Sequence, residues 1–281
     1  MRTVSTLLAE SPFRPAHDRS MQLLRGSRVP DAPTDLTTRF DPSVCDAAIH
    51  TWRARMVNEH RSSAVFAGLL PQLIEASASL DVQTAVLGAA TDEIFHATLC
   101  GDIVRAFGGD PTESAEPSLT PMPAHSSIVD PLERVLRNVL FVGCLSETVA
   151  VALLTVEREL AQDPYIRAIL ETILADEVAH ARLGWNFVTL HLPRLDGAAR
   201  TRLNAYLRVA FAYLQRRELE LLPVLPPLGT EIEHQRESVG LCNGSDARGL
   251  FFDTIDTVIV PRLTELGLDA REAYVQLTRA Q

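Results

Sequence analysis

Four long stretches of the chain place apolar residues at alternating steps of three and four, the pattern of one buried face of an α-helix. They cover about residues 42–78, 81–107, 131–161 and 164–192. Three of them begin at an Asp-Pro pair, in which Asp suits the N-cap and Pro the first helical position. Alternating patterns typical of strands are scarce, so the sequence predicts an all-α fold.

The connections between these stretches predict how the helices are arranged. The first two stretches are joined by only a few residues, as are the last two, which forces two antiparallel hairpins. A segment of about twenty residues, rich in Pro, Ser and Thr, joins the two hairpins and is long enough to run the length of a bundle. Residues 41–192 are therefore predicted to form a ferritin-like four-helix bundle with one long crossover.

The segments on either side of the bundle carry weaker patterns. Residues 1–40 contain few apolar residues and several Pro and Arg, so we expect an N-terminal arm that packs loosely. Residues 193–281 are expected to form a C-terminal helical extension that packs on the bundle. This extension begins with a fifth helix at 197–222, continues through a Pro-rich break and ends in one or two further helices.

Polar residues interrupt all four predicted buried faces near their middle. Each face contains one glutamate, and two of the faces contain a histidine three residues later; the six residues are Glu59, Glu93, His96, Glu147, Glu177 and His180. Four buried carboxylates without partners would each cost on the order of several kcal/mol and would take up protons instead. Two divalent cations would balance the four charges, and two neutral imidazoles would complete the ligands, so the pattern predicts a site for two metal ions.

The metal-ligand pattern is an internal repeat. The phrase DEIFHA occurs at 92–97 and the phrase DEVAHA at 176–181, and each places Glu and His on one helical face at spacing i, i+3. Each Glu-His pair can hold one metal ion, while Glu59 and Glu147 can bridge the two ions or cap them. The two predicted hairpins are therefore expected to be related halves of one site.

These phrases, together with NEHRSSA at 58–64 and LSETVAVALL at 145–154, resemble the ferritin-like di-iron carboxylate superfamily over about residues 42–192. The resemblance implies two iron ions, or manganese with iron, held by the six residues named above. In similar oxygenases the Asp that leads each phrase bonds to the histidine of the opposite half. That would pair Asp92 with His180 and Asp176 with His96; the alternative is that both are exposed helical acids.

Small side chains gather at one level beside the predicted metals. They are Ser63, Ala89, Gly143, Cys144 and Gly184. A core normally alternates large and small side chains, so this layer predicts an apolar cavity that suits O₂ and a modest, largely hydrophobic substrate. Close packing of the helices is the alternative explanation, and Cys144 also fits a small, inert core thiol.

The resemblance favours an oxygenase or oxidase within the superfamily. Storage ferritins lack the paired Glu-x-x-His symmetry, and rubrerythrin-type peroxidases usually carry a rubredoxin domain, for which no Cys-x-x-Cys pair is present. Arylamine N-oxygenases are similar in layout but carry a third histidine where this chain has Ile173. Aldehyde-deformylating oxygenases have similar spacing and the same two histidines, but they lack so long a C-terminal tail.

We therefore expect a non-haem di-iron enzyme that uses O₂ as co-substrate to hydroxylate, N-oxygenate, desaturate or cleave a small, largely apolar molecule. An external ferredoxin or reductase would supply electrons, since no flavin or nucleotide fingerprint is present. A ferroxidase or peroxide scavenger, and a non-catalytic metal-binding protein, are the alternatives. A homodimer is also an option, and the sequence does not identify the substrate.

Composition bears on the partners, the cellular location and the reaction class of the protein. A net charge of −10 argues against a nucleic-acid partner, which would require a basic face. No apolar run reaches the roughly eighteen residues of a membrane span, and the start of the chain lacks the apolar region of a signal peptide. Four cysteines without Cys-x-x-Cys spacing indicate reduced thiols and a cytoplasmic protein. All 26 basic residues are Arg, which excludes Schiff-base chemistry at lysine.

Overall fold

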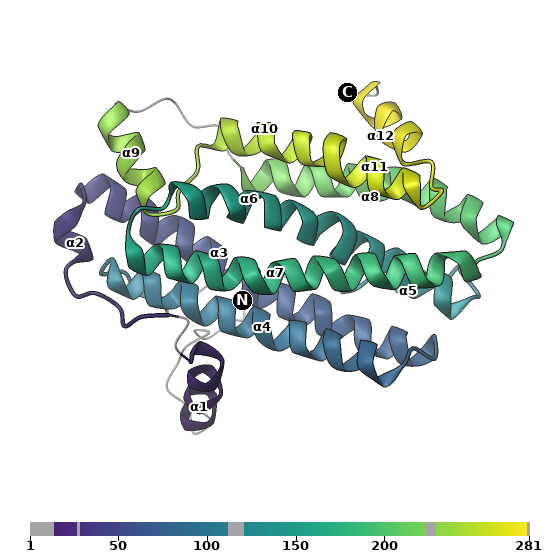
Figure 1. Ribbon diagram of the computed structural model, residues 1–281, viewed down its shortest axis with the longest axis horizontal. Coiled ribbons are helices and arrows are strands. Elements are labelled where there is room, and N and C mark those ends of the chain that lie inside the picture. Colours follow the sequence, from purple (N-terminus) through teal and green to yellow (C-terminus); the bar gives the residue numbers. More distant parts are fainter. Residues whose placement is uncertain (1–13, 27–28, 112–120, 223–228, 280–281) are drawn as a thin grey trace, which may run out of the picture.

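The computed structural model describes residues 14–26, 29–111, 121–222 and 229–279, which form helices and no strand. Four long helices make the central bundle (Figure 1): α3 (Pro42–Glu75), α4 (Leu80–Ala106), a third helix in three parts, and α7 (Pro164–His191). The three parts of the third helix are α5 (Pro131–Val139), η1 (Leu140–Ser146) and α6 (Glu147–Leu160). The predicted all-α bundle is thereby confirmed, with helix ends within a few residues of the expected ones.

The helix starts are fixed by the predicted Asp-Pro pairs. The side chains of Asp41, Asp130 and Asp163 each accept a hydrogen bond from a backbone N–H in the first helical turn. Short connections at 76–79 and 161–163 fold α3 back on α4 and α6 back on α7. These two hairpins bring four ligand-bearing helices side by side, as the connection lengths predict.

The third bundle helix is irregular directly before Glu147. Residues 140–146 form a π-helix, which widens the turn and changes the direction of the side chains that follow. Glu147, Thr148 and Val149 are buried, whereas Ala150, which a regular helical period places in the core, is half-buried. Glu147 and Leu154 are buried as a regular period predicts, so Ala150 alone departs from the expected face after the π segment.

The hydrophobic core is divided into two clusters by the polar residues at its centre. One cluster contains Phe66 of α3 and Ala90 of α4, and the other contains Met56 of α3 and Phe95 of α4. Along both helices the change from one cluster to the other falls where the glutamate stands. The two apolar clusters thus enclose a polar layer at mid-height of the bundle.

The C-terminal extension covers one side of the bundle (Figure 1). The expected fifth helix is α8 (Gly197–Leu221), which follows the short turn η2 (Leu192–Arg194). After the break come α9 (Thr230–Ser238), a long helix made of α10 (Gly244–Thr254), η3 (Ile255–Ile259) and α11 (Val260–Glu265), and α12 (Ala270–Arg279). This exceeds the one or two helices expected. α10 packs on α6, and α12 packs on α8.

The N-terminal arm is also partly helical, with α1 (Arg14–Arg25) and α2 (Leu36–Arg39). Arg25 pairs with Asp102 of α4, and Met21 and Leu36 are buried. The described part of the arm is therefore attached at these points, although Leu23 of α1 is 84% exposed, and residues 1–13 of the predicted arm lie outside the described residues.

The third bundle helix, Pro131–Leu160, is long and apolar enough to cross a membrane, with a mean hydropathy of 2.2 in its most apolar window. Yet 56% of that window is buried inside the structure. Glu133 and Glu147 are two of the buried side chains of this helix. A core helix of a bundle has the same length and composition. The burial and the two glutamates fit a core helix better than a membrane span.

Candidate metal centre

Six side chains from four helices meet in the polar layer of the bundle. Glu59 comes from α3, Glu93 and His96 from α4, Glu147 from the first residue of α6, and Glu177 and His180 from α7. All six are buried, with exposed fractions between 0% and 8%. The structure therefore brings together every residue that the sequence analysis singled out as a metal ligand.

The six residues form two overlapping groups of possible ligands. In the first, donor atoms of Glu59, Glu93, His96 and Glu177 lie within 4.8 Å of one another, and in the second the same holds for Glu93, Glu147, Glu177 and His180. Glu93 and Glu177 belong to both groups, whereas Glu59 and Glu147 each belong to one. The geometry thus places Glu93 and Glu177 where they can bridge two ions, and Glu59 and Glu147 at the outer ends.

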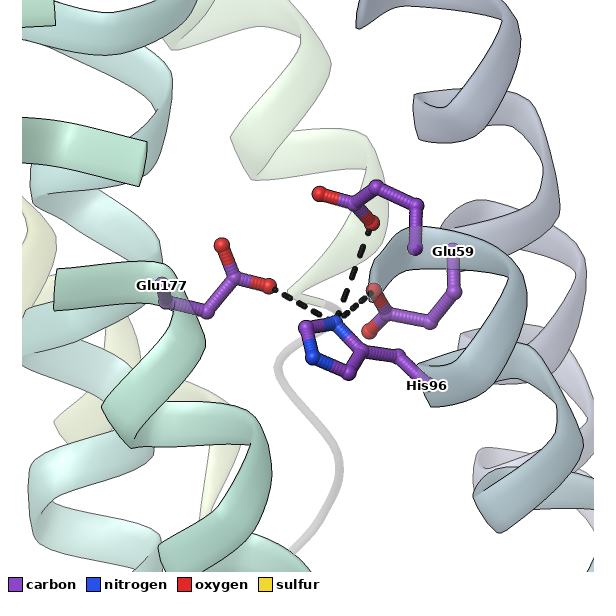
Figure 2. Close-up of side chains that lie close together, drawn as sticks. Glu59, His96 and Glu177 are labelled. Carbon is purple, nitrogen blue, oxygen red and sulfur yellow. Dashed lines mark ion pairs between the residues drawn. The ribbon is translucent and has the colours of Figure 1, made fainter. Parts of the chain in front are cut away.

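Both histidines direct the same ring nitrogen at the carboxylates. Nδ1 of His96 lies 3.4 Å from Oε1 of Glu177, 3.7 Å from Oε2 of Glu59 and 4.0 Å from Oε2 of Glu93 (Figure 2). Nδ1 of His180 lies 3.1 Å from Oε2 of Glu177 and 3.4 Å from Oε1 of Glu93. Each Nδ1 is therefore the atom placed to bind a metal ion.

The other ring nitrogen of each histidine faces an aspartate from the opposite hairpin. Nε2 of His96 lies 3.2 Å from Oδ2 of Asp176, and Nε2 of His180 lies 3.3 Å from Oδ2 of Asp92. These are the two cross-bundle contacts that the resemblance to similar oxygenases implies. An imidazole that donates its Nε2 proton to the carboxylate presents an unprotonated Nδ1 to the cluster, the tautomer that a metal ligand requires.

Without a cation the cluster must hold protons. Burial, reinforced by the negative charge of Glu177, raises the pKa of Glu93 and of Glu147. Burial acts to lower the pKa of His180, but hydrogen bonds to its carboxylate partners outweigh burial and raise that pKa to about 12. Burial would raise the pKa of Glu177, yet hydrogen bonds from His180 and His96 lower it. Of these four residues, Glu93, Glu147 and His180 therefore favour their protonated forms, and Glu177 favours its charged form.

Unpaired atoms in the cluster show that its residues fit metal ions. Both carboxylate oxygens of Glu93 and Nδ1 of His96 are buried without a hydrogen-bond partner. Leaving such a group unpaired costs roughly 1–3 kcal/mol, and more when it is charged. Carboxylate oxygens with imidazole nitrogens suit iron and manganese. The charge, the convergence and the unpaired atoms make this cluster a candidate site for divalent cations.

Metal uptake is expected to release protons, because Glu93, Glu147 and His180 favour protonated forms without metal but bind metal only when deprotonated. Since the folded-state pKa values are raised, lower pH favours the metal-free protein and the affinity for metal should increase as pH rises. Calorimetric titration with Mn(II) at neutral pH, in two buffers of different ionisation enthalpy, measures the protons released. Equal heats in both buffers would contradict this.

The small residues predicted to line a cavity include a close contact between two helices. A Cβ added to Gly143 would lie 2.5 Å from Cα of Gly184, so these two glycines let η1 and α7 touch through their backbones. Ala89 and Cys144 are buried in the packed core, and the Ser63 hydroxyl donates to the backbone carbonyl of His60 at 2.7 Å. Close helix packing, the alternative explanation, is what Gly143 and Gly184 provide.

A pocket nevertheless lies next to this layer and reaches the metal centre at His180. Its walls are apolar apart from that histidine, and its enclosed volume is about 10 Å³, room for roughly one water molecule; the larger space of about 290 Å³ includes open solvent. It is lined by Phe66, Leu69, Leu73, Val82, Val86, Val139, Val142, Gly143, His180, Leu183, Gly184 and Phe187. Of the five expected pocket residues, Gly143 and Gly184 line it, and larger side chains one turn further on supply most of the wall.

Sequence reasoning missed two residues close to the centre. Nη2 of Arg55 donates to both oxygens of Glu157, at 2.7 and 2.6 Å, and so connects α3 with α6. Arg55 stands one helical turn before Glu59, with its guanidinium 4.6 Å from the centre of the Trp52 ring. Phe66 lies 5.0 Å from the His180 ring and also lines the pocket. The signal that could have indicated the contact between Arg55 and Glu157 is the position of Arg55, four residues before Glu59 on the same helix.

Comparison with known proteins supports the fold. No family model matches this chain, and no curated protein matches it. Among solved structures, the chain is similar to protein 19 with aldehyde deformylating oxidase activity from Synechococcus, with a TM-score of 0.54 and 16% sequence identity. The similarity covers 84% of this chain and 99% of that one. The chain thus has the ferritin-like fold expected from its sequence, with a buried cluster of carboxylates and histidines at its centre.

Proposed function

We propose that this protein is a non-haem di-iron oxygenase or oxidase. It would bind two iron ions, or manganese with iron, and use O₂ to oxidise a small, largely apolar organic molecule. The observation that supports this best is the pair of ligand groups that share Glu93 and Glu177, beside an apolar pocket that reaches His180. The Synechococcus protein of similar fold has aldehyde deformylating oxidase activity, which makes an apolar aldehyde one candidate substrate.

Two bound iron ions would supply the electron transfer and O₂ binding that protein side chains lack. The chain's own residues would provide the charge balance, the orientation and the substrate site. Glu93 and Glu177 would hold both metal positions, and Glu59 and Glu147 would each complete one. Asp176 would keep the proton of His96 on Nε2, which leaves Nδ1 free.

The pocket would bind the substrate and exclude water from the His180 side of the centre. Its apolar walls at Phe66, Val86 and Phe187 give affinity for hydrocarbon rather than for charged groups. The reductant would come from outside the chain, as a ferredoxin or a reductase. The described cysteines are all free, which supports a reducing compartment such as the cytoplasm.

Fe(II)-loaded protein provides the test. Loading is done without O₂, and the protein is then exposed to ¹⁸O₂ and a chemical reductant with a panel of medium-length apolar aldehydes, amines and alkanes. We expect O₂ uptake that rises with one substrate class and a mass-shifted or shortened product. A Glu93→Gln variant serves as the inactive control. Oxidation of many Fe(II) ions per chain into a ferric mineral would point instead to a ferroxidase, and failure to retain metal would exclude both enzymes.

A further inference from the structure

The outer face of α4 carries an apolar stripe on the surface of the molecule. Leu80, Leu87 and Ile94 stand seven residues apart, and their exposed fractions are 78%, 47% and 41%. Residues at this spacing lie on one face of a helix, as in the seam of a coiled coil. Figure 1 places α4 at the edge of the bundle, on the side away from α8, α10 and α11, so the C-terminal extension does not cover this stripe.

Between Leu80 and Ile94 this face carries one charged group, the exposed Asp81 at its edge, seven residues before Gly88. Between Asp81 and Asp102 the charged or titratable groups of α4 are Asp92, Glu93, His96 and Cys100, which lie toward the metal centre or in the core. Thr84 and Thr91 stand between the apolar residues, and their hydroxyls donate to the backbone carbonyls of Leu80 and Leu87 at 2.8 and 3.0 Å. Their methyl groups therefore extend the apolar surface.

Gly88, beside Leu87 on this helix, packs against no other part of the chain among the residues that the structure describes. A Cβ added there would meet nothing within 4 Å. A glycine inside a helix costs roughly 0.5–1 kcal/mol relative to alanine, so its presence calls for a reason outside the single chain. A glycine at the edge of an exposed leucine stripe leaves room for a side chain from another helix.

We infer that this α4 face, made of Leu80, Thr84, Leu87, Gly88, Thr91 and Ile94, is where a second copy of the chain docks. Leu80 and Ile94 lie one heptad on either side of Leu87. A twofold axis at Leu87 would therefore place Leu80 of one copy against Ile94 of the other in an antiparallel helix pair. The inference does not depend on the reaction proposed above.

Charge favours a second copy over other occupants. Each copy carries a net charge of −10, so two copies repel least where they meet on a surface of low charge, and the α4 face carries only Asp81 at its edge. A face that binds a lipid surface is normally bordered by Lys or Arg, and residues 82–101 contain neither. The stripe from Leu80 to Ile94 is about 21 Å long at the helical rise. Because one helix pair buries less than a standard interface, we expect a dimer that dissociates on dilution.

Sedimentation velocity of the full chain over a concentration series tests the inference. The wild type is expected to shift from monomer to dimer, whereas Leu87→Arg stays monomeric at every concentration. Val209→Arg is the matched control, because Val209 is 63% exposed on α8, on the side of the bundle opposite α4 (Figure 1), and should leave the dimer intact. Gly88→Arg is a second variant that the fold tolerates, since that position is open, and it too should weaken the dimer.

A cysteine at the predicted axis gives an independent result. In an antiparallel pair, Leu87→Cys is expected to form a disulfide-linked dimer on mild oxidation, and Val209→Cys is not. A wild type that stays monomeric at the highest concentration would overturn the inference, as would a Leu87→Arg variant that dimerises as well as the Val209→Arg control. Flotation of monomer with phosphatidylcholine vesicles, lost in Leu87→Arg, would assign the face to a lipid surface instead.

Discussion

Glu93→Gln is expected to remove both metal ions from the protein, whereas Glu59→Gln is expected to remove only one. Glu93 belongs to both ligand groups, but Glu59 belongs to one. A glutamine offers one neutral oxygen where the carboxylate offers a charge and two oxygens. The loss of affinity at Glu93 should exceed the roughly 10–100-fold losses typical of residues that only orient a ligand. Metal content after anaerobic loading with Fe(II) and gel filtration measures the difference.

The fold of the metal-free protein should survive this change. Burial raises the pKa of Glu93, so the metal-free protein holds that carboxyl in its neutral form, which glutamine resembles in shape and charge. The melting temperature without metal should therefore stay close to that of the wild type. The increase in melting temperature on adding metal should disappear, because a ligand stabilises only a protein that binds it.

A buried glutamate outside the centre provides the control. Glu133 is fully buried and pairs with Arg137 and Arg202, so Glu133→Gln should lower the melting temperature of the metal-free protein. The amount of metal that the protein binds after loading should not change. Glu93→Gln protein that still holds two metal ions at wild-type affinity would refute the assignment of Glu93 as a shared ligand.

The sequence predicts the bundle well because several independent signals agree. Asp41, Asp130 and Asp163 mark helix starts through local hydrogen bonds, and the short connections leave no choice but antiparallel hairpins. The candidate ligands could be predicted for a related reason. A glutamate inside an apolar helical face is costly, and four of them at one level require a common explanation.

The remaining features depend on distances between helices, which a periodic pattern does not contain. Glu59 and Glu93 occupy equivalent places in their patterns, yet only Glu93 belongs to both ligand groups, because the rotation of each helix decides which carboxylate is central. The π-helix at Leu140–Ser146 consists of ordinary core residues and has no local marker. Small residues beside the metals fit either a cavity or a close contact, and only the separation of the backbones decides between them.

That close contact leads to the largest expected effect on stability. Gly143→Ala would place a Cβ 2.5 Å from Cα and 3.1 Å from N of Gly184, and Gly184→Ala would place one 2.5 Å from Cα of Gly143. Backbone atoms cannot rotate away as a side chain can, so η1 and α7 would have to separate. We expect destabilisation of at least the roughly 1–3 kcal/mol typical of overpacking, measured by urea unfolding of metal-free protein.

Gly249→Ala is the control for this prediction. Gly249 lies inside α10 and has nothing within 4 Å of an added Cβ, so alanine there should stabilise the protein by up to about 1 kcal/mol. Changes of opposite sign in the free energy of unfolding at Gly143 and Gly249 would establish close contact of the two helices, and equal changes would refute it.

Separation of these helices should also weaken metal binding, because Gly143 stands one turn before Glu147 and Gly184 one turn after His180. The affected ligand group is the one that contains Glu147 and His180. A cavity at this level would give a different result, in which alanine leaves unfolding unchanged and only substrate binding is reduced.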